Sequence, residues 1–186
     1  MVWLDELIKK CKKNDRNAQS ILFSEYKETL YLISLKYCRN EVDAQDNLHD
    51  AFMVIFEKIK TYKGKGSFEG WMKRITIYKA IDRYKRKKEI PLEPIDYSDD
   101  DTSIDSTFLD ISLDILLDFI QKLPDQYRLV FNLYQLDGYS HKEIAEILSI
   151  SENTSKTNYH RAKLQLKQKI IDFRKEGHSK SHTHEK

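Results

Sequence analysis

Apolar residues recur every three or four positions through most of the chain, which is the spacing that buries one face of an α-helix. The clearest run is Leu48, Ala51, Phe52, Ile55, Phe56 and Ile59. The chain has only 5 glycines and 3 prolines among 186 residues, so few positions suit the frequent turns of a β-protein. We therefore predict an all-α protein.

Two small helical domains fit this sequence better than one large core, because 33% of the residues are charged and 40% are apolar. The predicted domains span residues 1–88 and 109–175. Between them, residues 89–108 hold Pro91, Pro94 and an acidic polar stretch, which predicts a flexible linker. We expect residues 176–186 to be a disordered tail. The periodicity places helices at 2–13, about 18–37, about 43–59, 68–87, 108–123, 124–137, 141–148 and 152–175.

Charge is strongly segregated, although the net charge is only +2. Residues 58–88 contain twelve Lys or Arg and two acids, residues 89–121 contain ten acids and no Lys or Arg, and residues 152–175 contain seven basic side chains and two acids. Two basic blocks separated by an acidic one predict two surfaces that bind polyanions and a different partner for the middle.

A helix-turn-helix is predicted near the C-terminal end. Ser140 and Glu143 have the spacing of a capping box, Gly138 suits the end of the helix before it, and Ser151 can cap a second helix. The second helix of such a motif enters the major groove of DNA. The alternative is a solvated helix in a small bundle. Side chains predicted to contact duplex DNA are Ser151, Asn153, Thr154, Lys156, Thr157, His160 and Arg161.

The other basic block interleaves aromatic and cationic residues after a glycine-containing loop, with Ser67 as the predicted N-cap of its helix. Cations neutralise phosphates and exposed rings stack on unpaired bases, so this block predicts contact with single-stranded DNA. Alternatively, the spacing of Phe68, Trp71 and Ile75 is that of a buried helix face. Predicted contact residues are Lys63, Lys65, Phe68, Trp71, Arg74, Tyr78, Arg83, Arg86 and Lys87.

Other functions are less well supported by the residues. His49-Asp50 resembles a metal phosphohydrolase dipeptide, but the other five histidines lie at 141 or beyond, so we predict no enzyme, metal or cofactor. A dimeric operator-binding regulator could use the same helix-turn-helix, although no dimerisation heptad is evident. His178, His182 and His184 could chelate a metal from the tail, but we favour a flexible polar end that binds none.

The compartment and the membrane can also be judged from the sequence. No apolar run approaches the roughly 20 residues that a membrane span needs, and Asp5 and Glu6 stand where a signal peptide would be basic. We expect a cytoplasmic protein without membrane insertion, with Cys11 and Cys38 as reduced, partly buried thiols. The alternative is a disulfide between them.

Three segments in this order resemble the extracytoplasmic-function (ECF) group of sigma-70-type sigma factors. Residues 43–52, DAQDNLHDAF, are similar to region 2.2; residues 66–82, which include GSFEGWMKRI and AID, are similar to regions 2.3 and 2.4. Leu123-Pro124, residues 144–151 (IAEILSIS) and His160-Arg161-Ala162 are similar to region 4.

This resemblance implies a set of partners. Asp43, Asp46 and Asp50 would dock on core RNA polymerase. The segment similar to regions 2.3 and 2.4 would melt and read the single-stranded −10 element of promoter DNA, and region 4 would read the duplex −35 element. The acidic linker would thread toward the active-site and RNA-exit channel, and an anti-sigma factor would be a further partner.

The chain departs from the family pattern at four positions. Ser149 replaces a usual glycine in the turn and is expected to tolerate a strained backbone. Ser155 replaces a common valine, Asn158 a common arginine, and Tyr78 a typical asparagine.

Overall fold

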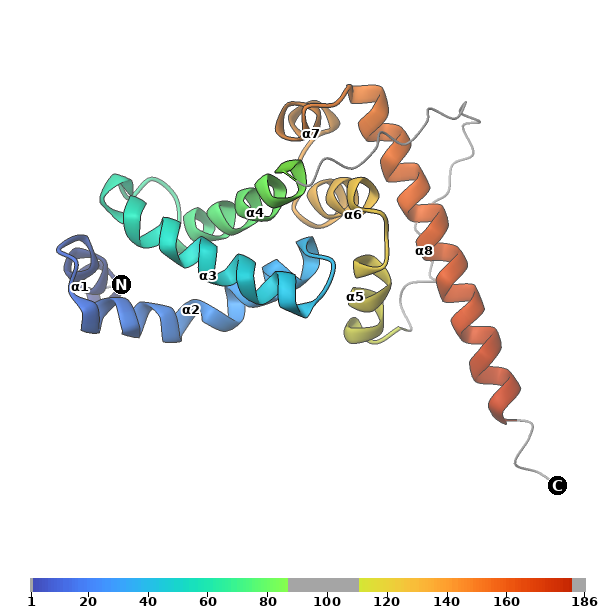
Figure 1. Cartoon of the computed structure of the whole chain (residues 1–186), viewed down its shortest axis with the longest axis horizontal. Coiled ribbons are helices and arrows are strands. Elements are labelled where there is room, and N and C mark those ends of the chain that lie inside the picture. The colour runs from blue at the N-terminus through green and yellow to red at the C-terminus, as the bar shows by residue number, and fades with distance from the viewer. Residues whose placement is uncertain (1, 87–110, 182–186) are drawn as a thin grey trace. The chain divides into compact units, whose positions relative to one another are not determined.

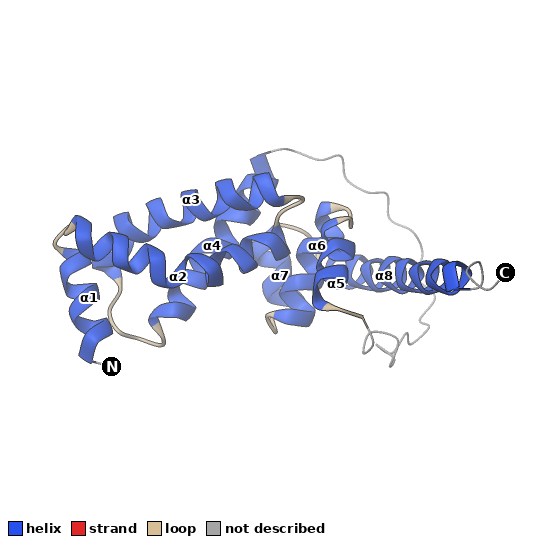
Figure 2. Ribbon diagram, turned by 90° about the horizontal axis from the view of Figure 1, so that it is seen from below, coloured by secondary structure: helices blue, strands red, loops and turns tan. Residues whose placement is uncertain are grey.

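All regular structure in the described part of the chain is helical. The computed structural model describes residues 2–86 and 111–181, and within these two ranges helices are joined by short turns, without strands (Figure 2). The prediction of an all-α protein is confirmed. The chain divides into two compact units, Met1–Lys88 and Glu89–Lys186, each described here by itself (Figure 1). The predicted linker, residues 89–108, lies outside the described residues.

Side-chain caps fix where the helices of the N-terminal unit begin. The Ala18 N–H donates to Asp15 Oδ1 at 3.0 Å, and the Asp43 N–H donates to Asn40 Oδ1 at 2.8 Å. Each contact satisfies an amide that has no partner within its helix. The unit contains α1 (Val2–Lys12), α2 (Arg16–Tyr37), α3 (Glu41–Lys58), the short 3-10 helix η1 (Ile59–Thr61) and α4 (Phe68–Arg86).

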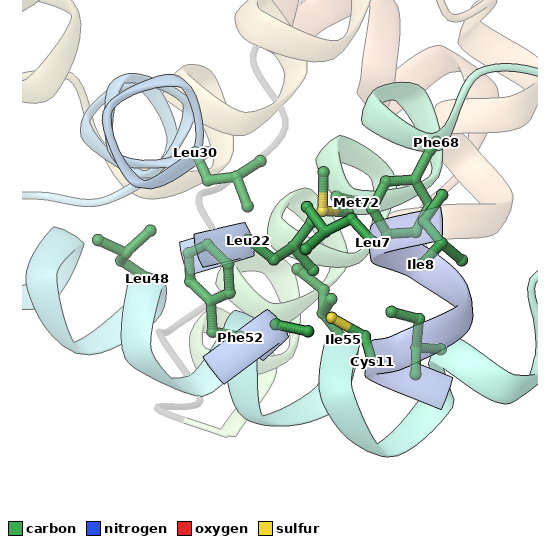
Figure 3. Close-up of a cluster of buried hydrophobic side chains, with 12 residues drawn as sticks. Leu7, Ile8, Cys11, Leu22, Leu30, Leu48, Phe52, Ile55, Phe68 and Met72 are labelled. Carbon is green, nitrogen blue, oxygen red and sulfur yellow. The ribbon is translucent and has the colours of Figure 1, made fainter. Parts of the chain in front are cut away.

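The four long helices of this unit enclose one apolar core (Figure 3). The predicted stripe faces inward: Leu48, Ala51, Phe52 and Ile55 of α3 and Ile59 of η1 are buried. Phe56 is partly buried against them. Phe23 packs its ring on Phe52 with centroids 4.7 Å apart. The other buried members are Leu7, Ile8, Cys11, Ala18, Leu22, Leu30, Phe68 and Met72.

A buried polar network joins α2, α3 and α4 within this core. The Asn47 side-chain amide donates to Ser34 Oγ at 3.0 Å and to the Thr76 carbonyl oxygen at 3.2 Å. Ser34 and Thr76 in turn donate to the carbonyl oxygens of Leu30 and Met72 on their own helices. Because an unpaired buried polar group is costly, these bonds fix how the three helices are registered.

The C-terminal unit ends in the predicted helix-turn-helix. Its elements are α5 (Leu113–Gln121), α6 (Asp125–Phe131), the π-helical turn η3 (Asn132–Leu136), α7 (His141–Leu148) and α8 (Glu152–Ser181). Two predicted bounds were wrong: α5 begins at Leu113 instead of Phe108, and α8 continues to Ser181, into the segment predicted to be a disordered tail. Residues 182–186 lie outside the description.

Local signals around the turn act as predicted. Ser140 and Glu143 form the capping box of α7. Ser149 adopts the left-handed conformation, with φ 58° and ψ 47°, and Ser151 caps α8 by accepting the Thr154 N–H at 3.0 Å. Gly138 takes a positive φ of 73° after η3, a conformation that glycine adopts without strain.

A buried ion pair lies on α6, beside the hydrophobic core of the C-terminal unit. Arg128 and Asp125 pair within α6, both nearly inaccessible to solvent. Arg128 Nη1 also donates to the carbonyl oxygens of Leu123 at 2.9 Å and Gln121 at 3.2 Å, groups near the end of α5. These bonds pair the guanidinium with the acceptors that a buried charge requires. The core beside it comprises Ile120, Leu123, Tyr127, Phe131, Ala162 and Leu166.

Candidate nucleic-acid interfaces

The first two turns of α8 present a polar surface. Asn153 and Lys156 are exposed, and Thr154, Thr157 and His160 are half-buried. Lys156 forms an ion pair with Glu152 at 2.9 Å, about half of each side chain remaining accessible. Since both partners are at the surface, the Lys156 ammonium can exchange this carboxylate for a phosphate at little cost.

Arg161 follows Thr157 by one turn of α8, but its guanidinium is engaged within the unit. Its Nη1 donates to the Tyr127 hydroxyl at 3.2 Å, and the side chain is half-buried against the unit. We had predicted an exposed cation at this position. The structure instead gives Arg161 a role in joining α8 to α6.

Two polar residues of α8 that we had noted only as departures from the family are buried. Ser155 is fully buried, with its Oγ 2.9 Å from His141 Nδ1, and the Asn158 amide donates to Gln126 Oε1 at 3.1 Å. Together with Ala162, Leu166 and Ile170, they form the inward stripe of α8. These positions have helical spacing in the sequence. Because Ser155 and Asn158 are polar, a pattern of apolar residues does not reveal that they are buried.

His141 is held at the start of α7 between aromatic rings. Its ring stacks on Tyr134, with centroids 4.2 Å apart and planes 11° apart, and lies 5.9 Å from Tyr159. Burial, followed by the charge of Lys156, lowers the pKa of His141, and Glu152 opposes this shift. The neutral imidazole is therefore favoured in the folded unit.

In the N-terminal unit, a short loop before α4 presents two lysines. Gly64 and Gly66 have φ values of 75° and 77°, a conformation that strains other residues. The Tyr62 hydroxyl donates to the Gly66 carbonyl oxygen at 2.8 Å and closes the loop. Lys63 and Lys65 are exposed on it. A backbone without side chains at 64 and 66 leaves room for a nucleotide to approach.

An aromatic cluster of Tyr62, Phe68 and Trp71 supports this loop. The Phe68 and Trp71 rings stack with centroids 5.5 Å apart, and Tyr62 lies 5.0 Å from Phe68 and 5.5 Å from Trp71. Phe68 is 3% exposed. The prediction that Phe68 contacts DNA is therefore corrected: it is a core residue. Trp71 packs on the core but stays partly accessible.

Further along α4, Arg74 is exposed and lies over the Tyr78 ring, 5.7 Å from its centroid. This arrangement holds a cation beside an aromatic face on the outside of the unit. The side chain of Arg86 and all of Lys87, both predicted to contact DNA, lie outside the described residues.

Arg83 binds all three acids that we had predicted to dock on another protein. Its guanidinium lies 3.0 Å from Asp50, 3.2 Å from Asp46 and 3.9 Å from Asp43, and Lys79 lies 3.9 Å from Asp50. Desolvation alone would lower the pKa of Arg83, but the hydrogen bonds that Arg83 donates to Asp46 and Asp50 outweigh it and raise the pKa. This carboxylate cluster (Asp43, Asp46, Asp50) clasps α3 to α4, so Arg83 is not an open DNA contact.

Comparison with known proteins matches both units to one family. Residues 22–90 match Sigma-70 region 2 and residues 113–166 match Sigma-70, region 4. The ECF RNA polymerase sigma factor SigW of Bacillus subtilis is 30% identical over 184 residues, covering 89% of this chain and 96% of SigW. This chain belongs to the ECF group of the sigma-70 family. Its place is therefore in transcription initiation by RNA polymerase, as a regulatory protein.

Other members of the family align with this sigma factor over most of their length. The ECF RNA polymerase sigma-E factor of Haemophilus influenzae is 24% identical over 177 residues, covering 88% of this chain and 93% of that protein. Among solved structures, RpoE of Bartonella quintana in complex with the anti-sigma factor NepR has 15% identity and a TM-score of 0.49, with 82% of this sigma factor and 96% of that chain covered.

Metal ligands, cysteines and membrane spans can be assessed only in the described part of this sigma factor. Across residues 2–86 and 111–181, no group of three or more His, Cys, Asp or Glu side chains is arranged to hold a metal ion. Cys11 and Cys38 are free and buried, and burial, followed by the charge of Asp15, raises the pKa of Cys11. None of the described helices is long and apolar enough to cross a membrane.

Proposed function

We propose that this sigma factor binds core RNA polymerase in the cytoplasm, recognises −35 and −10 promoter elements and aids promoter melting. The observation that carries the proposal is the two-sided start of α8. One side bears exposed Asn153 and Lys156, and the other is fixed to the unit through Ser155 and Asn158. Arg161, between the two sides, adds a hydrogen bond to Tyr127. A reading helix needs both accessible polar groups and a rigid support.

Region 4 reads the −35 duplex through the outer side of α8. Asn153 and Lys156 supply amide and ammonium groups for base edges and phosphates. Ser151, Thr154, Thr157 and His160 flank them on the same turns. The N-terminus of α8 adds the favourable dipole that attracts a phosphate.

Region 2 engages the −10 element through the loop of Lys63 and Lys65 and the outer side of α4. The two lysines follow the backbone of the displaced strand, while Arg74 and Tyr78 offer a cation and a ring. Trp71 both packs on the core and exposes an edge that an unpaired base can contact.

We assign docking on the polymerase clamp to the carboxylate cluster. Because Arg83 is ion-paired with Asp46 and Asp50, the docking surface includes this guanidinium as well as the acids. Membership of the ECF group also implies a sequestering anti-sigma protein as a partner. The acidic segment 89–108 is proposed to enter the polymerase channel as a nucleic-acid mimic, on the basis of its sequence charge.

Run-off transcription with core RNA polymerase and a promoter library tests the proposal and yields the preferred −35 and −10 sequences. With the selected promoter, Asn153→Ala combined with Lys156→Ala is expected to lower run-off product at least about tenfold, because a good base contact contributes roughly 1–3 kcal/mol and about 1.4 kcal/mol is a factor of ten. Binding of the variant to core polymerase should be unchanged.

Lys175→Ala is the matched control for charge. It removes a lysine from the same helix, about 28 Å from Lys156 at 1.5 Å per residue, and is expected to leave promoter use unchanged. Loss of product in Lys175→Ala as great as in the recognition variant would point to a general charge effect. A wild-type chain that gives core polymerase no promoter preference would refute the proposal.

The −10 assignment is tested separately by permanganate reactivity of unpaired thymines. Lys63→Ala with Lys65→Ala is expected to reduce strand opening about tenfold or more. Each lysine lost removes a phosphate contact to the displaced strand, and such contacts stabilise DNA binding in a salt-dependent way. The control, Lys9→Ala with Lys10→Ala, removes the same charge from exposed positions on α1. Equal opening by both double variants would contradict a role for the loop.

A further inference from the structure

The geometry points to His141 and Ser155 as a positioning pair that sets the angle at which α8 meets the −35 duplex. This inference rests on the proposed function of region 4 and concerns how the reading helix is aimed. Neither side chain needs to touch DNA for this role. Both act through the first two turns of α8.

The contact between the pair spans the turn of the motif. His141 is the first residue of α7, and Ser155 lies one turn into α8. Their Nδ1 and Oγ atoms are 2.9 Å apart. Because Ser155 is fully buried, its hydroxyl depends on this protein contact and not on water.

The imidazole cannot move freely, because aromatic rings from two other elements hold it. Tyr134 of η3 stacks on one face at 4.2 Å. Tyr159 of α8 lies 4.6 Å from Tyr134, and its hydroxyl donates to Gln135 Oε1 at 2.5 Å. The pair is thus tied to η3, α7 and α8 at once, and η3 provides the fixed support.

A hydrogen-bonded pair restricts the orientation of α8 more narrowly than an apolar pair would. Valine is common in the family where Ser155 stands, and a buried valine contributes packing but no hydrogen bond. A hydrogen bond has a narrow range of length and angle. An unpaired buried hydroxyl is also unfavourable, so orientations of α8 that break the contact are disfavoured.

The position of the pair makes the angle matter for DNA. Asn153, Lys156 and Thr157 lie within two residues of Ser155, so they move with it. A site of this kind must be held within about 0.5 Å and 10–20° to keep its contacts. Small rotations of α8 about Ser155 would therefore weaken discrimination between −35 sequences before they unfold the unit.

The test measures −35 discrimination, defined as run-off product from the selected promoter divided by product from the same promoter with a scrambled −35 element. His141→Phe and Ser155→Ala are each expected to lower this ratio about tenfold, and the double variant about tenfold as well, because coupled residues are not additive. His141→Asn places an amide near the Nδ1 position and is expected to retain most of the ratio.

Ile170→Val is the control for a merely structural effect, because Ile170 is fully buried on α8 and lies about 22 Å beyond Ser155 at 1.5 Å per residue. It should lower the midpoint of thermal unfolding without changing the ratio. The inference is overturned if His141→Phe leaves the ratio unchanged, if the two single losses multiply in the double variant, or if Ile170→Val causes the same loss. Absence of −35 discrimination in the wild type would instead refute the proposed function itself.

Discussion

Two residues in the helix-turn-helix are held in an unfavourable state, one in its backbone conformation and one in its surroundings. Ser149 is the clearest case, since a side chain in the left-handed region costs roughly 1–2 kcal/mol. The resemblance to the family predicted this strain from the missing glycine. His141 is the second case, because a titratable ring is partly buried near the charge of Lys156.

Replacing Ser149 with glycine is expected to stabilise the C-terminal unit by about 0.5–1 kcal/mol. Glycine removes the left-handed strain but gives up part of the gain through its greater freedom in the unfolded chain. Hydrogen exchange of amides in α7 and α8 measures the change. Ser149→Ala keeps the Cβ and should give no gain, so equal protection in both variants would argue against strain at this residue.

The pKa of His141 predicts a pH dependence of stability. The pKa is lowered in the folded unit, so neutral His141 contributes stability that is present above the unfolded pKa of about 6.5. That contribution is lost as the pH falls from about 6.5 through the lowered folded pKa, because the unfolded chain binds the proton more readily.

Thermal unfolding between pH 7.5 and 5.0 should therefore show a larger decrease in stability for the wild type than for His141→Asn. The remaining ionisable residues are the same in the two proteins, so the difference between the two curves reports His141. Parallel curves for the two proteins would show that His141 does not contribute.

At the scale of elements, capping chemistry largely determines where helices begin. Ser67, Ser140 and Ser151 were all predicted from sequence as N-caps, and each accepts a backbone N–H in the structure. These signals are local, involving residues three positions apart, so a sequence shows them directly.

Contacts between elements were not predictable in the same way. The pairing of Arg83 with Asp46 and Asp50 joins residues 37 and 33 positions apart, and helical periodicity does not show which exposed faces of α3 and α4 meet. The burial of Phe68 was one of two alternatives left open by its spacing. The π-helical turn η3, which places Tyr134 beside His141, has no local signal that we could identify.

The start of α4 offers a sharp test of capping. The Gly70 N–H donates to Ser67 Oγ at 3.0 Å, and a Cβ added at Gly70 would lie 2.8 Å from that oxygen. In a Ser67→Ala background, Gly70→Ala should stabilise by about 1 kcal/mol through helix propensity. In the wild type the gain should be nearly cancelled by loss of the cap, which contributes about 1 kcal/mol.

Urea unfolding followed by tryptophan fluorescence measures this cycle, because Trp3 and Trp71 both belong to the N-terminal unit. Equal gains in the two backgrounds would mean that the Ser67 hydroxyl and the new methyl group do not compete.

For the whole molecule, the two units have separate hydrophobic cores. We expect Leu22→Ala, at a fully buried position, to cost the N-terminal unit about 2–5 kcal/mol. Tryptophan fluorescence should report this loss, while hydrogen exchange in α6, α7 and α8 stays as in the wild type. Faster exchange in those helices would indicate that the cores unfold together.

The clasp of Arg83 on the carboxylate cluster has a consequence for any basic partner that uses these acids. Such a partner must displace a guanidinium already seated there, so association becomes an exchange of one cation for another. The number of ion pairs then changes little on complex formation. Raising ionic strength weakens the old and the new pairing alike, so binding at this surface should be less sensitive to salt than three carboxylates would suggest.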